Sequence, residues 1–268
     1  MGRDETPSVE LKRRQLACLW LDGQATLRSE SDAIRFVRAV GFALRYNATP
    51  GLPMASMFRA AGEKRRAIEL TNFLLAHAEV VETNLIAGRL VLVQRDLVPA
   101  VYVLRKRRRS TQPSLDARRA LALIGREGQA TAGDVRRCLR IAGRKRPDRA
   151  DVALAELQYE MLIDRGPSSV PKRGIPYLSP EGFPYRVLEK AHPELVRSAG
   201  KLGVEDAVCS VVEAYLRAAL FVTPRKLTSI FKLLFSDAEA RAAIVTLVRT
   251  HRARQTGTLV VRAALPFE

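Results

Sequence analysis

Cysteine and histidine are scarce in this chain of 268 residues, which contains three of each. Cys18, Cys138 and Cys209 are far apart and fall within helical patterns. We therefore expect small buried side chains in a reducing compartment rather than a disulfide framework. No cysteine and histidine pair has the spacing of zinc ligands, so the sequence predicts no metal site.

Long apolar runs are also missing. Nothing approaches the roughly 18 consecutive apolar residues that a membrane-spanning helix needs. Residues 1–14 are charged and lack the apolar core of a signal peptide, so we expect a cytoplasmic protein without a membrane anchor. Glycine-rich phosphate loops and Ser/His/Asp patterns are absent too, so the sequence predicts no cofactor and no triad chemistry.

Acidic residues are few compared with basic ones. The chain has 45 lysines and arginines against 28 aspartates and glutamates, which gives a formal net charge of +17. Such self-repulsion is tolerated most readily by a protein whose partner is a polyanion. Nucleic acid is the first expectation, and an acidic membrane surface is the alternative. Because 47% of the residues are hydrophobic, we expect a folded chain.

The clearest pattern runs from Ser114 to Pro180. Apolar periodicity predicts helices over 115–126, 131–141 and 148–161, and the last two begin with capping-box spacings. A strand over 162–165 is predicted to turn at 166–169 and to return through 174–178. Helix, short helix, longer helix and hairpin is the order of a winged helix-turn-helix unit.

The same order occurs on both sides of this stretch. In residues 29–94, a helix from the capping box at Ser29 to about Tyr46 is followed by two helices and a hairpin. Residues 204–262 again show three helices, the last starting with a capping box at Ser236, and a small hairpin. We predict a mainly α fold with short β-hairpins, built from three tandem winged helix-turn-helix units. Their predicted bounds are 1–104, 114–180 and 204–264, with linkers at 105–113 and 181–203, the second holding a short helix over 183–191.

Clusters of basic residues mark the candidate DNA-binding positions. They lie in the first linker, in the loop before the third helix of the middle unit, near the tip of its wing, and at the start of the third helix of the first unit. Phosphate contact is expected there, the alternative being a solvated turn or linker. The residues are Arg105, Lys106, Arg107, Arg108, Arg109, Arg144, Lys145, Arg146, Lys172, Arg173, Lys64, Arg65 and Arg66. Arg225 and Lys226 are weaker candidates, since they also suit solubility.

With its glycine-containing helix end, basic crossing segment, proline-rich linker and helical last unit, the chain resembles the tandem winged-helix DNA glycosylases. Those enzymes unhook interstrand crosslinks and excise alkylated bases, and the resemblance implies three winged helices arranged as a C around DNA. The family's catalytic Gln-x-Gln or Gln-x-Asp motif follows a glycine in the first unit. Here Gly41-Phe42-Ala43-Leu44-Arg45-Tyr46 is the best match, so Leu44 and Tyr46 occupy the catalytic positions.

A leucine cannot orient a water molecule or stabilise a developing sugar cation, so we assign no catalytic residue. We predict a DNA-binding protein acting in repair or genome maintenance, contacting duplex or structured DNA largely through phosphates, and associated with the nucleoid if the cell is bacterial. One alternative is a DNA glycosylase with a divergent catalytic set. The other is a transcription regulator.

Overall fold

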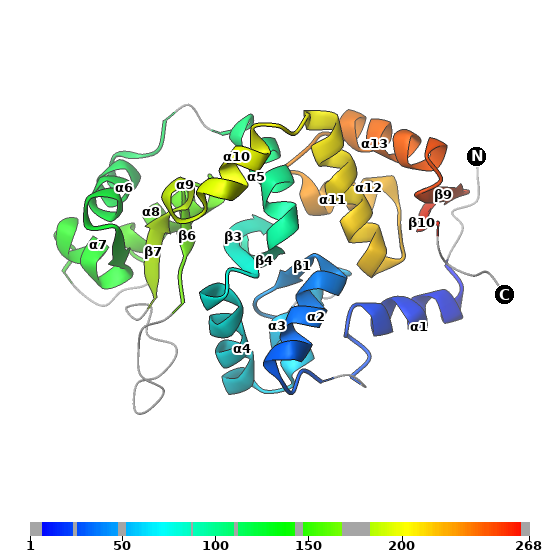
Figure 1. Cartoon of the computed structure of the whole chain (residues 1–268), viewed down its shortest axis with the longest axis horizontal. Helices are drawn as coiled ribbons and strands as arrows, with labels where there is room; N and C mark the ends of the chain where they lie inside the picture. Colours follow the sequence, from blue (N-terminus) through cyan, green and yellow to red (C-terminus); the bar gives the residue numbers. More distant parts are fainter. Residues whose placement is uncertain are drawn as a thin grey trace.

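The computed structural model describes residues 7–23, 26–47, 52–86, 88–109, 112–142, 147–167 and 183–263. Three small β-sheets, each accompanied by its own helices, form three winged-helix units in these ranges. Figure 1 shows the first unit between the other two, with the middle unit at one end of the long axis and the third unit at the other. The predicted fold class is confirmed.

The first unit contains a four-stranded sheet with strand order β2-β1-β4-β3, in which β1 and β2 are parallel. A short 3-10 turn, Arg95–Leu97, leads from the sheet into the last helix. Its elements are α1 (Val9–Cys18), α2 (Glu30–Val40), β1 (Phe42–Leu44), β2 (Ala55–Ser56), α3 (Met57–Ala61), α4 (Lys64–Ala76), β3 (Val80–Ile86), β4 (Arg89–Gln94) and α5 (Val98–Lys106).

The prediction that α2 continues to about Tyr46 is wrong. The helix ends at Val40 because Gly41 adopts a φ of +70°, and residues 42–44 form β1 instead. Strand β1 pairs antiparallel with β4, so its backbone groups are satisfied by the sheet. A Cβ atom at Gly41 would lie 2.8 Å from Cδ1 of Leu97, so a larger residue here would strain the backbone and force the Leu97 side chain to shift.

The middle unit contains a three-stranded sheet with strand order β5-β7-β6. Its elements are α6 (Leu115–Glu127), β5 (Gln129–Thr131), α7 (Ala132–Cys138), α8 (Arg149–Tyr159), β6 (Ile163–Arg165) and β7 (Pro184–Val187). The return strand expected over 174–178 lies outside the described residues. Strand β6 pairs with β7, so the helix expected from residue 183 is wrong for 184–187 and begins only with α9 (Leu188–Ala191). Buried Tyr185 anchors β7 in the core of this unit.

The third unit follows α10 (Pro193–Ala199) and contains a sheet with strand order β8-β10-β9. Its elements are α11 (Val204–Ala219), β8 (Phe221–Val222), α12 (Pro224–Phe231), α13 (Asp237–Arg249), β9 (Ala253–Thr256) and β10 (Leu259–Arg262). Helices α12 and α13 are capped by Thr223 and Ser236, whose side chains accept hydrogen bonds from main-chain amides in the first helical turn.

The first and third units share one hydrophobic core. Side chains of α5 pack with those of α11 and with the aromatic residues Tyr215, Phe231 and Phe235. The middle unit has a separate core between α6, α8 and its sheet. All three cysteines are free thiols, but only Cys209 is buried, so the prediction of buried cysteines is wrong for Cys18 and Cys138.

Candidate nucleic-acid interface

The basic run at residues 105–109 lies where the three units meet. Helix α5 extends to Lys106, so the segment expected to be a linker from residue 105 begins as helix. Arg105 is only 3% exposed. Its Nε donates to the carbonyl of Tyr159 at 2.7 Å, and its Nη2 pairs with Oε1 of Glu160 at 2.9 Å. Its guanidinium cannot reach a phosphate without leaving these partners.

The next three arginines also contact protein groups. Arg107 and Arg108 both pair with Glu239 of the third unit, and the hydrogen bond from Arg107 is the main reason that the pKa of this carboxyl falls to about 2. Arg109 donates to the carbonyls of Glu160 and Met161 in the middle unit, at 2.7 and 3.1 Å. The run therefore joins the three units. Lys106 and Arg107 are both exposed, but Arg107 pairs with Glu239, whereas Lys106 forms no ion pair within the described ranges.

Basic residues at the start of α4 form a more accessible surface. Lys64 and Arg65 are exposed, and Arg66 is half-buried. Arg65 pairs with Glu69 at 3.2 Å and Arg66 with Glu63 at 4.0 Å, in solvent-exposed pairs that contribute little stability. The side chain of Glu63, the residue before α4, makes no hydrogen bond to the first turn of the helix. It therefore leaves the main-chain N–H groups of that turn uncapped. The helix end and its cations together favour a phosphate.

The basic loop and wing of the middle unit lie outside the described residues. This applies to Arg144, Lys145, Arg146, Lys172 and Arg173. The acidic residues of α8 have structural partners nearby. Asp151 and Asp148 both bind Arg136, and Glu156 accepts hydrogen bonds from the amide and hydroxyl of Ser114.

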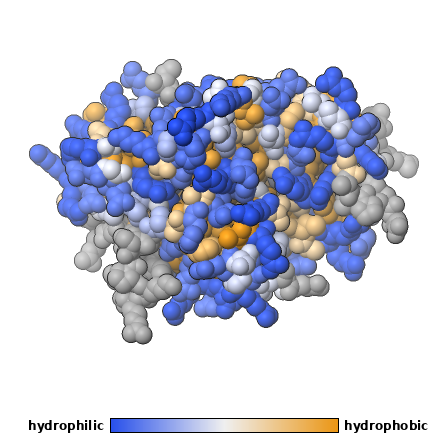
Figure 2. Space-filling model, in the orientation of Figure 1, coloured by the Kyte–Doolittle hydropathy of each residue, from blue (hydrophilic) through white to orange (hydrophobic). Residues whose placement is uncertain are grey.

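The outward face of α13 lies outside the candidate DNA-binding positions that were predicted from the sequence. Arg241, Val245 and Arg249 are spaced four residues apart and are all exposed, with Val245 at 65%. Within the described part of the chain, neither arginine forms an ion pair. The regular spacing of basic and apolar side chains on one helical face is the signal that could have identified this surface. Figure 2 shows hydrophilic side chains covering most of one side of the molecule, interrupted by smaller apolar patches.

The catalytic positions implied by the resemblance lie at the end of β1. Leu44 is 1% exposed and part of the hydrophobic core, whereas Tyr46 is 43% exposed and packs edge-on against Phe58 at 4.9 Å. A cavity of about 260 Å³ opens beside them. Its described lining residues are Leu44, Tyr46, Asn47, Gly88, Arg89 and Leu90, and none of these is an aspartate or glutamate.

The buried carboxylate of Glu82 is held between two guanidinium groups. Arg45 donates to Oε2 of Glu82, and Arg165 donates to Oε1 at 2.8 Å. Burial raises the pKa of Glu82, but the positive charges of both arginines outweigh this effect and lower it overall. The carboxylate is thus ionised with both oxygens engaged, an arrangement that suits a structural anchor better than a general base.

Gln94 is the glutamine next to Gly41 in the sheet. Its amide N–H donates to the carbonyl of Gly41 at 2.9 Å. Its side chain, however, bonds to Asp96 through both the carboxylate and the main-chain amide. Gln94 therefore caps the following 3-10 turn and does not substitute for a catalytic glutamine.

The described residues contain neither a metal site nor a membrane-spanning helix. No three histidine, cysteine, aspartate or glutamate side chains in the described ranges gather closely enough to hold a metal ion. No helix within these ranges combines the length and the hydrophobicity that crossing a bilayer requires.

No protein-family model matches this sequence, and no curated protein sequence matches it either. Among solved structures, the chain is similar to the DNA glycosylase AlkZ of Streptomyces sahachiroi. The TM-score is 0.53 at 15% sequence identity, over 94% of this chain and 69% of AlkZ. At this identity the comparison establishes the architecture. The chain therefore has the fold of AlkZ, three winged-helix units in tandem.

Proposed function

We propose that this protein binds duplex or structured DNA, largely through the phosphates, and acts in DNA repair or genome maintenance. The observation that carries this proposal is the similarity of nearly the whole chain to a DNA glycosylase. The net charge of +17 supports it, because a surplus of cations on three winged-helix units suits a polyanionic partner.

Lys64, Arg65 and Arg66 at the start of α4 are the best-supported phosphate contacts. The ion pairs of Arg65 and Arg66 are exposed and easily exchanged for a phosphate. Lys106 remains a candidate because it is exposed at the end of α5. The cations of the middle loop and wing stay in the proposed set on the grounds of their sequence pattern. Arg105 leaves it, because its charge is buried against Glu160.

In our proposal, DNA binding does not lead to base excision at the position of Leu44. A glycosylase stabilises positive charge on the sugar and activates a water molecule, and a buried leucine has no polar atom for either task. The neighbouring carboxylate, Glu82, is already bound by two arginines.

A glycosylase with a different catalytic group is the second candidate function. The fold of AlkZ and the cavity of about 260 Å³ beside the exposed Tyr46 favour it, since an extruded base needs such a pocket.

The two candidate functions differ in whether the protein produces abasic sites in DNA. Incubation with alkylated or crosslinked duplexes, followed by detection of abasic sites, separates them. We expect bound but intact DNA, and turnover that is lost in a Tyr46→Phe variant would favour the enzyme.

Binding itself is tested with a labelled random duplex at several salt concentrations. We expect the logarithm of the binding constant to fall linearly with the logarithm of the salt concentration, because each phosphate contact releases counterions. A binding constant that does not change with salt would contradict the proposal.

A further inference from the structure

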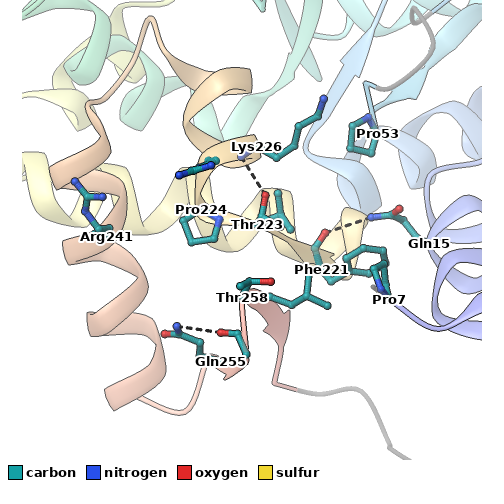
Figure 3. A pocket seen from close by; sticks show the side chains of 14 residues that line it. Pro7, Gln15, Pro53, Phe221, Thr223, Pro224, Lys226, Arg241, Gln255 and Thr258 are labelled. Atoms are coloured by element: carbon teal, nitrogen blue, oxygen red, sulfur yellow. Dashed lines mark hydrogen bonds between the residues drawn. The ribbon is translucent and has the colours of Figure 1, made fainter. Parts of the chain in front are cut away.

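A cavity in the third unit lies between α12, α13, the hairpin of β9 and β10, and residues from the first unit (Figure 3). Its volume is about 830 Å³. Pockets of roughly 300–1,000 Å³ are typical of small-molecule binding sites. The cavity is separate from the smaller one beside Tyr46, since the two share no lining residue.

Three positively charged side chains line this cavity. Arg225 and Lys226 come from the first turn of α12, and Arg241 comes from α13. The described residues around the cavity include no aspartate or glutamate. Nor does any of the three cations form an ion pair elsewhere in the described ranges. Their charges are therefore available to an anion that enters the cavity.

The remaining walls are apolar or carry neutral donors. Pro7, Pro53, Phe221 and Leu259 provide apolar surface. Gln15 is fixed in place because its Nε2 donates to the carbonyls of Ala219 and Phe221, at 2.6 and 3.2 Å. Figure 3 shows that these side chains come from segments far apart in the sequence, so the cavity forms only in the folded chain.

The donors for an anion are mainly side chains. Pro224 has no amide hydrogen, and the amide of Lys226 already donates to Oγ1 of Thr223 at 3.2 Å. Flexible Arg and Lys side chains above an apolar wall suit a ligand that has a charged group beside a flat apolar one. A nucleotide has this combination, with the phosphate bound by the cations and the base placed against the prolines and Phe221.

We propose that this cavity is a nucleotide-binding site that accepts a phosphate ester with its attached base. Two sources supply this chemistry, a single strand of DNA and a free mononucleotide. The first source rests on the proposed DNA-binding function, whereas the second does not. In the first case the site holds a strand end or an unpaired nucleotide while the other units contact the duplex.

The test uses the full-length chain, an oligothymidylate of about eight nucleotides, free thymidine monophosphate and a random duplex. The variants are Lys226→Gln and Arg241→Gln, alone and combined, which remove charge while keeping much of the side-chain volume. Arg197→Gln in α10 is the control, because it removes an exposed charge that does not line the cavity. Thermal unfolding of each variant shows whether it is folded.

We expect each single variant to weaken oligothymidylate binding about fivefold and the control to leave it unchanged. Competition by the free mononucleotide assigns the site to that source, and absence of competition assigns it to a DNA strand. Equal effects of the cavity variants and the control, or no effect of the combined variant on either ligand, would overturn the inference.

The results also separate this inference from the proposed function. Duplex binding that persists while the combined variant leaves both nucleotide ligands unaffected refutes the cavity and keeps the function. Mononucleotide binding that depends on Lys226 and Arg241, in a chain that binds no DNA, keeps the cavity and refutes the function.

Discussion

Arg165 in the middle unit and Glu82 in the first unit form a buried ion pair, with 2.8 Å between Nη1 and Oε1. Arg45 binds the other carboxylate oxygen, and both guanidinium groups lie over the ring of Phe183, at 5.1 Å for Arg45 and 3.9 Å for Arg165. Arg165 and Phe183 belong to the middle unit, whereas Arg45 and Glu82 belong to the first unit. This buried cluster therefore fixes the middle unit against the first.

Glu82→Gln should destabilise the protein strongly. The substitution leaves two guanidinium charges without their counter-ion in a buried site, a change that costs about 3 kcal/mol or more. Urea unfolding of the two proteins measures the difference. Glu69→Gln is the control, because Glu69 forms an exposed pair with Arg65 and its loss should change stability by less than about 1 kcal/mol. Similar losses in the two variants would refute the role given to the cluster.

Glu239 should make the stability depend on acidity. Its pKa is about 2 in the folded protein, compared with an ordinary value of 4.5. As the pH falls, the Glu239 carboxylate therefore binds a proton at a higher pH in the unfolded chain than in the folded protein. The contribution of Glu239 is complete above pH 4.5 and disappears as the pH falls towards 2. Wild type and Glu239→Gln should therefore differ most in urea midpoint at about pH 6, and the difference should shrink as the pH falls from 4.5 towards 2. A difference that stays constant over this range would contradict the assignment.

Gly41→Ala tests the end of α2. Alanine at a φ of +70° costs about 1–2 kcal/mol, and its Cβ would also meet Leu97 at 2.8 Å. Gly125→Ala is the matched control within α6, where a Cβ atom would lie in ordinary contact with Val187 at 3.8 Å. That change should stabilise the helix by about 0.5–1 kcal/mol. Thermal or urea unfolding measures the change in stability of each variant. A change of the same sign in both variants would contradict the role given to Gly41.

Local signals in the sequence predicted much of the fold. Four capping boxes identify helix starts from side chains only three residues apart, and all four are present in the structure. They begin at Ser29, Thr131, Asp148 and Ser236. The hairpins of the first and third units were predicted for the same reason, because the turn and the strand pattern are local.

Contacts between distant residues were the part that the sequence could not show. A run of arginines is usually solvated, and nothing near Arg105 indicates that Glu160 and the carbonyl of Tyr159 surround it in the fold. Likewise, the prolines around β7 indicated a linker, whereas burial of Tyr185 and pairing with β5 and β6 make it the middle strand. The cavity lined by Arg225 and Arg241 combines residues from five segments and has no local pattern.

Arg105→Gln should separate structure from DNA binding. Removing the buried guanidinium leaves Glu160 without its cation, so unfolding should require less urea. The salt dependence of DNA binding, measured at a temperature where the variant is folded, should equal that of wild type. A shallower salt dependence in this variant would show that Arg105 contacts a phosphate.

The DNA-binding proposal requires that exposed cations such as those at the start of α4 bind DNA phosphates. Its most direct test compares wild type with Lys64→Gln/Arg65→Gln/Arg66→Gln by titrating salt against binding of a random duplex, with Arg197→Gln as the control. Each lost phosphate contact lowers the slope of log K against log salt by about 0.9. We predict a slope reduced by about two or three in the triple variant and unchanged in the control. An unchanged slope in the triple variant, or wild-type binding that is insensitive to salt, would contradict the account.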